Sequence, residues 1–155
     1  MPLLDYKNIP QKLIKQNAVL GIDYGTKKIG VAISDRSWMI ASPYKLVRNT
    51  KFTNVAKEIF QMVDDEKIEL IVIGNPIYLD NVVSKMQQSS RQFGMNLTKL
   101  RDINIVFYDE RFTSIMAKEA MVEQNLNFRR RLQKVDKVAA TFMLQRFLDY
   151  IEKQK

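Results

Sequence analysis

Three acidic positions in this sequence have a residue type and a placement that suit metal-assisted chemistry. Asp23 ends the apolar run AVLGID, Glu110 comes shortly after the run INIVFY, and Asp136 follows Val135 near the start of a predicted final helix. Carboxylate oxygens are ligands that Mg²⁺ prefers. Two such ions about 3.5–4 Å apart can stabilise both the attacking and the leaving oxygen of a phosphodiester. These acids are therefore the candidate metal ligands and catalytic residues.

Each acid also has a simpler interpretation, which the residues alone leave open. Asp23 could be a turn residue of a hairpin, and Glu110 or Asp136 could be a first-turn acid that favours the helix dipole. Asp109 precedes Glu110, and because adjacent side chains on a strand point in opposite directions, we favour Glu110 as the inward one. Asp35, in a Ser-Asp pair that closes a strand, is expected to be a turn residue.

The chain lacks two residue types on which many enzymes depend. It has no His and no Cys, which excludes Ser-His-Asp triads, Cys-His dyads, HExxH sites and thiolate zinc sites. The formal net charge is +8. A balance this basic favours a polyanionic partner such as nucleic acid, or else a basic solvated surface without a specific partner.

Basic residues occur in predicted loops and element ends near the same edge as the acids, where they could bind phosphates. They are Lys27, Lys28, Arg111, Arg129, Arg130 and Arg131. A solvated loop is the alternative for any one of them. The three consecutive arginines favour nucleic acid, because they precede a candidate metal ligand.

Hydrophobic periodicity predicts the elements that must position these residues. The expected strands are 18–23, 28–35, 39–47, 69–74 and 103–108, and the expected helices are 52–66, 82–99, 113–124 and one from about 135 to the end. Pro43 indicates an edge strand or a bulge. This order predicts an α/β fold with a mixed five-stranded sheet, a three-strand antiparallel meander plus two parallel strands, flanked by helices. Ligands are expected at the carboxyl ends of the strands.

The length of 155 residues suits one domain. We expect residues 1–16 to form an N-terminal extension and residues 17–153 to form that domain. The sequence has no apolar run of membrane-spanning length and no signal-peptide core, so we expect a cytoplasmic protein without a membrane partner.

Four motifs, in their order and spacing, resemble the YqgF/RuvX family over roughly residues 17–153. They are GIDYGTKKIGVAISD, IVIGNPI, FYDERFTS and VDKVAATFMLQRFLDYI. The resemblance implies a ribonuclease H-like fold and identifies Asp23, Glu110 and Asp136 as ligands of one or two Mg²⁺ or Mn²⁺ ions. The chain departs from the family pattern near Asn81 and at 112–114, which affects substrate contacts more than catalysis.

The family is described both as pre-16S ribosomal RNA nucleases and as Holliday junction resolvases. We therefore expect a nuclease that hydrolyses phosphodiesters in structured nucleic acid, with 5′-end processing of pre-16S rRNA in ribosome biogenesis as the favoured role. Its partners would be pre-rRNA or branched DNA and the ribosomal precursor particle, and it would be a monomer or a weak homodimer.

Three other functions remain open. A Holliday junction resolvase needs two symmetric cuts and therefore a two-fold dimer. A non-catalytic RNA-binding ribosome assembly factor would fit the basic charge equally well. Asp-x-Gly-Thr at 23–26 also resembles the phosphate loop of actin-like ATPases and sugar kinases, but those proteins bind nucleotide between two such domains and this chain has room for one.

Overall fold

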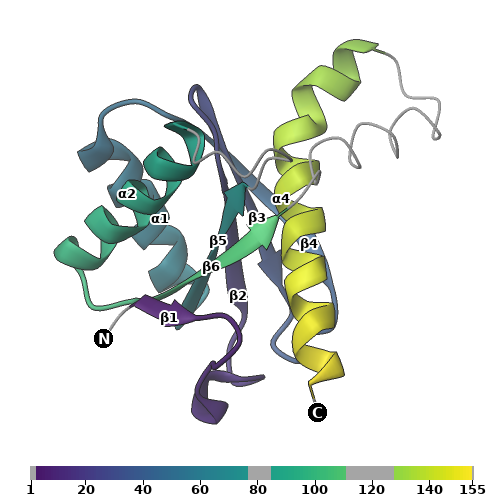
Figure 1. The fold of residues 1–155 in the computed structure, drawn as a ribbon. Helices are drawn as coiled ribbons and strands as arrows, with labels where there is room; N and C mark the ends of the chain where they lie inside the picture. The colour runs from purple at the N-terminus through teal and green to yellow at the C-terminus, as the bar shows by residue number, and fades with distance from the viewer. Residues whose placement is uncertain (1–2, 77–84, 111–127, 155) are drawn as a thin grey trace.

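The computed structural model describes residues 3–76, 85–110 and 128–154, with side chains described for 5–74, 88–108 and 138–154. One mixed sheet lies at its centre (Figure 1), with the strand order β1-β6-β5-β2-β3-β4. The strands are β1 (Leu3–Asp5), β2 (Val19–Tyr24), β3 (Lys28–Ser34), β4 (Ala41–Arg48), β5 (Leu70–Pro76) and β6 (Asn104–Glu110).

The pairing directions confirm the predicted topology. Strands β2, β3 and β4 form the antiparallel meander, while β5 pairs parallel to β2 and β6 pairs parallel to β5. Pro43 lies in the edge strand β4, next to a register shift between Val31 and Ala32 of β3, so the edge and the bulge are both present.

The prediction of five strands was one strand short. Strand β1, from the segment expected to be an extension, pairs parallel to β6 with Leu3 opposite Ile105. Three residues are too few to show an alternating apolar pattern, so periodicity could not reveal this strand.

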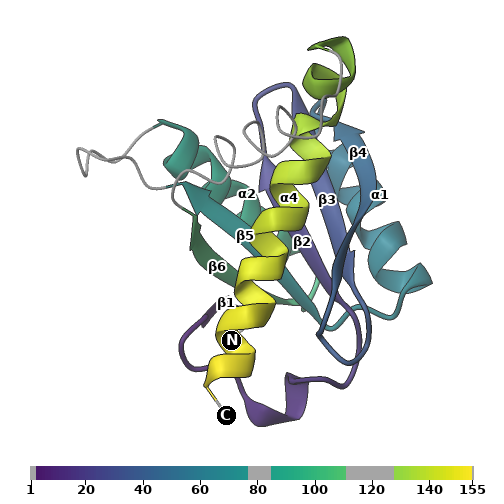
Figure 2. The same ribbon diagram turned by 90° about the vertical axis from the view of Figure 1, so that its right-hand side faces the viewer.

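Helices cover both faces of the sheet (Figures 1 and 2). Helices α1 (Phe52–Asp65) and α2 (Lys85–Leu100) lie on one face, and α4 (Phe128–Lys153) crosses the other. A short 3₁₀ helix, η1 (Gln11–Leu13), precedes β2. The predicted helix at 113–124 lies outside the described residues. Each face has its own buried cluster, with Ile22 and Ile59 in the α1/α2 cluster and Val19 and Phe147 in the α4 cluster.

Helix α4 approaches the sheet closely over Gly21 in the middle of β2. A Cβ added to Gly21 would lie 2.9 Å from Leu144 Cβ, so only glycine allows this approach without a shift. The helix runs against the direction of β5 and β6, which brings its N-terminal half to the end where those strands finish (Figure 1). The carboxyl edge of the sheet and the N-terminal half of α4 therefore face one another.

Within the described ranges, no helix combines the length and the apolar character needed to cross a membrane.

Candidate active site at the carboxyl edge of the sheet

Asp23 lies at the carboxyl end of β2, half-buried, and is paired with Gly30 of β3. Successive residues of a strand face opposite sides of the sheet. Gly21, two residues earlier, faces Leu144 of α4, so Asp23 faces the α4 side. Tyr24, the next residue, packs into the α1/α2 cluster on the other side. The end of β2 therefore carries an acid on one face and an aromatic ring on the other.

Glu110 is the last residue of β6, and Asp109 precedes it within the strand. The prediction that both acids follow the strand was wrong, because they pair in register with Pro76 and Asn75 of β5. Glu110 has the same parity along β6 as Tyr108, which packs against the α4 cluster. The backbone register thus puts position 110, rather than position 109, on the face of the sheet that α4 covers. The side chains of both acids lie outside the described part of the structure.

Asp136 belongs to α4, but it is not near the helix start as predicted. The helix begins at Phe128 and its first turn contains no acidic residue, so the interpretation of Asp136 as a helix N-terminal acid is also wrong. At helical spacing, Asp136 continues the stripe formed by Ala140, Met143 and Phe147, all fully buried under the helix. The side chain of Asp136 itself lies outside the described part.

Backbone spacing relates these three positions. Leu144 touches Gly21, and Asp136 is two helical turns earlier, about 12 Å along the axis. Asp23 is about 7 Å beyond Gly21 along β2. Ile22 is level with Ile73, which is paired with Phe107. Glu110 is consequently about 7 Å beyond the level of Asp23 along the strand direction.

The structure therefore brings the three backbone positions to one edge of the sheet. Among the side chains that the structure describes, no group of three or more acids lies close enough together to hold a metal ion. That set includes Asp23 but neither Glu110 nor Asp136.

Four exposed cations, which we name the basic ridge, occupy the same end of the molecule. They are Lys27, Lys28, Arg48 and Lys51. Lys28 is paired with Arg48 across β3 and β4, and Lys51 is the N-cap residue of α1. Sequence analysis identified Lys27 and Lys28 but missed the other two. The meander register is the signal that could have found them, because it places the end of β4 beside the start of β3.

The other arginines predicted to contact phosphates have side chains outside the described part of the structure. Arg129, Arg130 and Arg131 lie in the first turn of α4 rather than in a loop, and their side chains lie outside the described part. Arg111 lies outside the described residues altogether. Cations in the first turn oppose the helix dipole, so helix stability does not explain three consecutive arginines there.

The turn after Asp23 is held by Asn49, which sequence analysis did not single out. The Asn49 side-chain amide donates a hydrogen bond to the Gly25 carbonyl at 2.9 Å, and the Asn49 backbone N–H donates to the Lys27 carbonyl at 2.9 Å. A Cβ on Gly25 would collide with the Lys28 carbonyl oxygen, so the turn requires glycine. These contacts fix the β2–β3 turn, and with it Lys27, against the end of β4.

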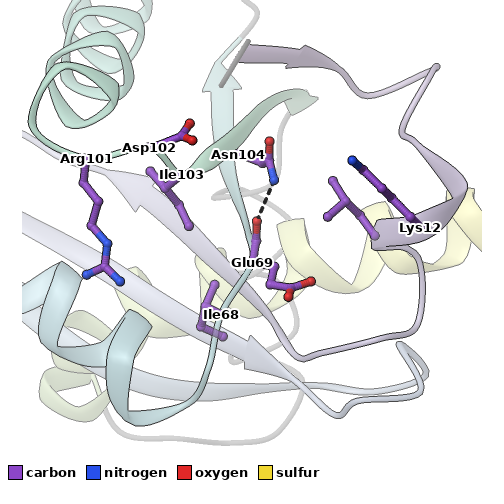
Figure 3. Close-up of a pocket in the computed structure, with 8 residues that line it drawn as sticks. Lys12, Ile68, Glu69, Arg101, Asp102, Ile103 and Asn104 are labelled. Atoms are coloured by element: carbon purple, nitrogen blue, oxygen red, sulfur yellow. Dashed lines mark hydrogen bonds between the residues drawn. The ribbon is translucent and has the colours of Figure 1, made fainter.

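A pocket of about 480 Å³ lies at the opposite end of the sheet (Figure 3). It opens where β5 and β6 begin, and Asn104 there donates a hydrogen bond to the Glu69 carbonyl at 3.2 Å. Its lining balances Lys12 and Arg101 against Glu69 and Asp102. Because ligands bind at the carboxyl ends of such sheets, and because these charges cancel, this pocket is not where we place a polyanion.

A family model and individual relatives both match nearly the whole chain. Residues 17–150 match the model of a family described as "RuvX: Holliday junction resolvase". A protein of Paramagnetospirillum magneticum, named "Putative pre-16S rRNA nuclease", is 37% identical, with 96% of each chain covered. A protein of Phenylobacterium zucineum with the same name is 39% identical, covering 96% of this chain and 97% of the relative.

Solved structures show that the fold is ribonuclease H-like. Thermus thermophilus RuvC in complex with a Holliday junction substrate matches with a TM-score of 0.56 at 12% identity, covering 86% of this chain and 96% of RuvC. The fowlpox virus Holliday junction resolvase matches with a TM-score of 0.50 at 12% identity, covering 89% and 99%. At these identities the likeness concerns the fold alone.

Proposed function

We propose that this chain, which belongs to the RuvX family of nucleases, is a metal-dependent endonuclease that processes the 5′ end of pre-16S rRNA during ribosome biogenesis. The observation that supports the proposal is that β2, β6 and α4 all reach one edge of the sheet, and each of these elements carries one of the candidate ligands Asp23, Glu110 and Asp136. The names of the relatives that match nearly the whole chain support the RNA substrate.

The donor set fits Mg²⁺ or Mn²⁺. The chain has no His and no Cys, and its methionine thioethers are soft ligands that suit other metals, whereas carboxylates are the oxygen ligands that these hard cations prefer. We assign Asp23, Glu110 and Asp136 to hold one or two ions. When bound, the ions would supply positive charge at the scissile phosphate, where negative charge develops in the transition state.

The chain's own residues would bind and orient the substrate. The basic ridge is exposed beside Asp23 and can hold phosphates on the approach to the edge. We extend this role to Arg111, Arg129, Arg130 and Arg131, which are close in sequence to the other two candidate ligands. Asn49 would contribute indirectly, by fixing the turn that presents Lys27 and Lys28.

The organisation of the protein follows from this role. We propose that residues 17–153 form the single catalytic domain, that the protein works in the cytoplasm, and that its partner is the ribosomal precursor particle. It would act there as a monomer or a weak homodimer.

A second candidate function is Holliday junction resolution, which the family description favours. It would require the chain to form a two-fold dimer, because a four-way junction is resolved by two symmetric cuts. Cleavage of a four-way junction by a dimer, without cleavage of the RNA, would support it over the ribosomal role.

The decisive experiment compares two variants on two substrates. Wild type, Asp23→Asn and Asp35→Asn are incubated with a pre-16S rRNA fragment and with a synthetic four-way junction in the presence of Mg²⁺ or Mn²⁺. Asp35, at the other end of the hairpin, is the matched control because it is a turn acid outside the site. We expect RNA cleavage by wild type and Asp35→Asn and none by Asp23→Asn.

Folding is checked in each variant by circular dichroism. Equal RNA cleavage by folded Asp23→Asn would refute the assignment of the site. RNA binding without cleavage by wild type, at every metal concentration tested, would favour the non-catalytic assembly factor.

A further inference from the structure

A second pocket opens beside Asp23, on the opposite side of β2. This edge pocket has a volume of about 260 Å³ and is formed where the end of β2, the start of α1 and the middle of α2 meet. Its lining includes three aromatic rings and three side-chain amides: Tyr24, Phe52 and Phe93, and Asn49, Gln92 and Asn96. Among the residues that the structure describes, its lining contains no acidic and no basic side chain.

The aromatic rings form one connected wall. Tyr24 packs on Phe93 with 4.8 Å between ring centroids and an interplanar angle of 36°, and Phe52 meets Phe93 edge-on at 5.9 Å and 84°. Phe93 is buried beneath the other two, which are each only half-buried. Tyr24 and Phe52 therefore keep part of their ring surface open to the pocket, where a planar group could stack.

The amides of α2 supply hydrogen-bonding groups at the other side. Gln92 Nε2 donates to Asn96 Oδ1 at 2.8 Å, which orients both amides. The Gln92 oxygen can still accept and the Asn96 nitrogen can still donate. One acceptor beside one donor complements the edge of a nucleobase, which presents both kinds of group.

The charge around the pocket indicates what carries the planar group. Thr50, another lining residue, lies between Arg48 and Lys51 of the basic ridge, and Asn49 fixes the turn that bears Lys27. A neutral aromatic pocket bordered by exposed cations matches a base attached to a phosphate backbone. It matches an apolar peptide less well, because the amides and hydroxyls of the lining would be left without hydrogen-bond partners.

We propose that the edge pocket binds one unpaired base of the RNA substrate, next to the phosphodiester that reaches Asp23. The inference rests on the proposed function, since it takes the substrate to be RNA. RNA recognition commonly works this way, with a base from a single-stranded segment stacked on aromatic side chains and hydrogen-bonded at its edge. Because Asp23 and Tyr24 are consecutive residues that face opposite sides of the sheet, the base would lie across the end of β2 from the cleaved bond.

The test is an abasic scan of the RNA. A labelled pre-16S fragment with an unpaired segment is made with a single abasic site at each position in turn. Its affinity for the full-length protein is then measured by fluorescence anisotropy in EDTA, so that the RNA stays intact. Loss of the stacking between one base and an aromatic side chain should weaken binding by about 5- to 160-fold at one position.

Two protein variants test whether the base at the sensitive RNA position binds in the edge pocket. In the double variant Gln92→Ala/Asn96→Ala, and separately in Tyr24→Leu, we expect the wild-type RNA to bind more weakly and the abasic penalty to shrink. The matched control is Gln61→Ala, which removes a similar hydrogen bond, from Gln61 Nε2 to Asp65 Oδ1 at 2.9 Å, on the exposed face of α1. The control should keep the full abasic penalty.

The results separate the pocket from the catalytic proposal. If wild type binds and cleaves the RNA but no abasic position matters, or if the penalty is unchanged in both pocket variants, the inference about the pocket is refuted and the nuclease assignment stands. If wild type neither binds nor cleaves the RNA, the proposed function fails and the pocket inference fails with it.

Discussion

The close approach of α4 to β2 gives a strong test of how the active site is held. Replacing Gly21 by Ala adds one methyl group at the place where a Cβ would lie 2.9 Å from Leu144 Cβ and 3.2 and 3.3 Å from its two Cδ atoms. Ordinary contacts between carbon atoms are about 3.5–4.0 Å. The helix must therefore move away from the sheet by about 0.6–1 Å, because a Cβ atom, unlike the end of a side chain, can only move with the backbone.

The shift has a cost in stability and a larger cost in activity. Overpacking costs about 1–3 kcal/mol, and replacing a strand glycine by alanine returns about 0.5–1 kcal/mol of backbone entropy. The net loss in free energy of unfolding is then about 0–2.5 kcal/mol. Since α4 carries Asp136, a displacement near 1 Å is expected to lower kcat by about 10- to 100-fold.

Stability is measured by urea unfolding, followed by the fluorescence of Trp38. It is the single tryptophan of the chain, is buried, and lies 6.1 Å from the Phe147 ring of α4. Val63→Ala is the matched control, because it removes buried side-chain volume from the α1/α2 cluster near the end of α1, away from the carboxyl edge of the sheet. It should lower stability while leaving kcat nearly unchanged. Unaltered kcat in Gly21→Ala, or an equal loss in Val63→Ala, would refute the reasoning.

Three further predictions concern charge and metal. Arg48→Ala should weaken RNA binding about equally for all sequences, and it should reduce the slope of log K against log salt concentration by about 1, measured by anisotropy between 50 and 200 mM salt. An unchanged slope would show that Arg48 does not contact an RNA phosphate. Hydrogen bonds from the Ser37 hydroxyl and from the Ile40 and Met39 amides lower the pKa of Asp35, so this stabilisation is present above the unfolded pKa of about 3.9 and is lost as pH falls through the lower folded pKa. Ser37→Ala should therefore destabilise the protein at pH 7, and the difference from wild type in urea unfolding should disappear as pH falls through the lowered folded pKa of Asp35; a difference independent of pH would contradict this. EDTA should abolish RNA cleavage and added Mg²⁺ or Mn²⁺ should restore it, and cleavage that persists in EDTA would exclude a metal mechanism.

The sheet could be predicted largely from sequence because its strands carry their own signals. The meander and the two parallel strands are marked by apolar alternation or by continuous apolar runs, and Pro43 marks the edge. The ends of the strands were harder to predict from the sequence. Strand β6 continues through Asp109 and Glu110 by pairing with β5, and polar residues that pair at the end of a strand leave no hydrophobic pattern.

The sequence suggests the residues of the candidate site but not their surroundings. The start of α4 was placed too late because the apolar stripe begins at Val135, whereas FRRRLQK before it carries only two apolar residues. The roles of Arg48 and Asn49 depend on the pairing of β4 with β3. Such contacts join residues about twenty positions apart, and local periodicity does not report them. Asp35 was correctly expected to be a turn residue, since its carboxylate accepts hydrogen bonds from the Met39 and Ile40 amides.

The end of β2 joins the proposed chemistry to the proposed recognition. Asp23 faces α4 and Tyr24 faces α1 and α2, so the acid and the aromatic wall lie on opposite faces of the sheet but are joined by one peptide step of the backbone. A bound base would be held at a fixed offset from the metal site, because no flexible segment lies between them. The pocket at the start of β5 could not serve in this way. It lies at the far end of a strand of seven residues, about 20 Å away. A nuclease that must choose one bond in a long RNA gains its selectivity from such a short and rigid spacing, which is why we place recognition at this edge.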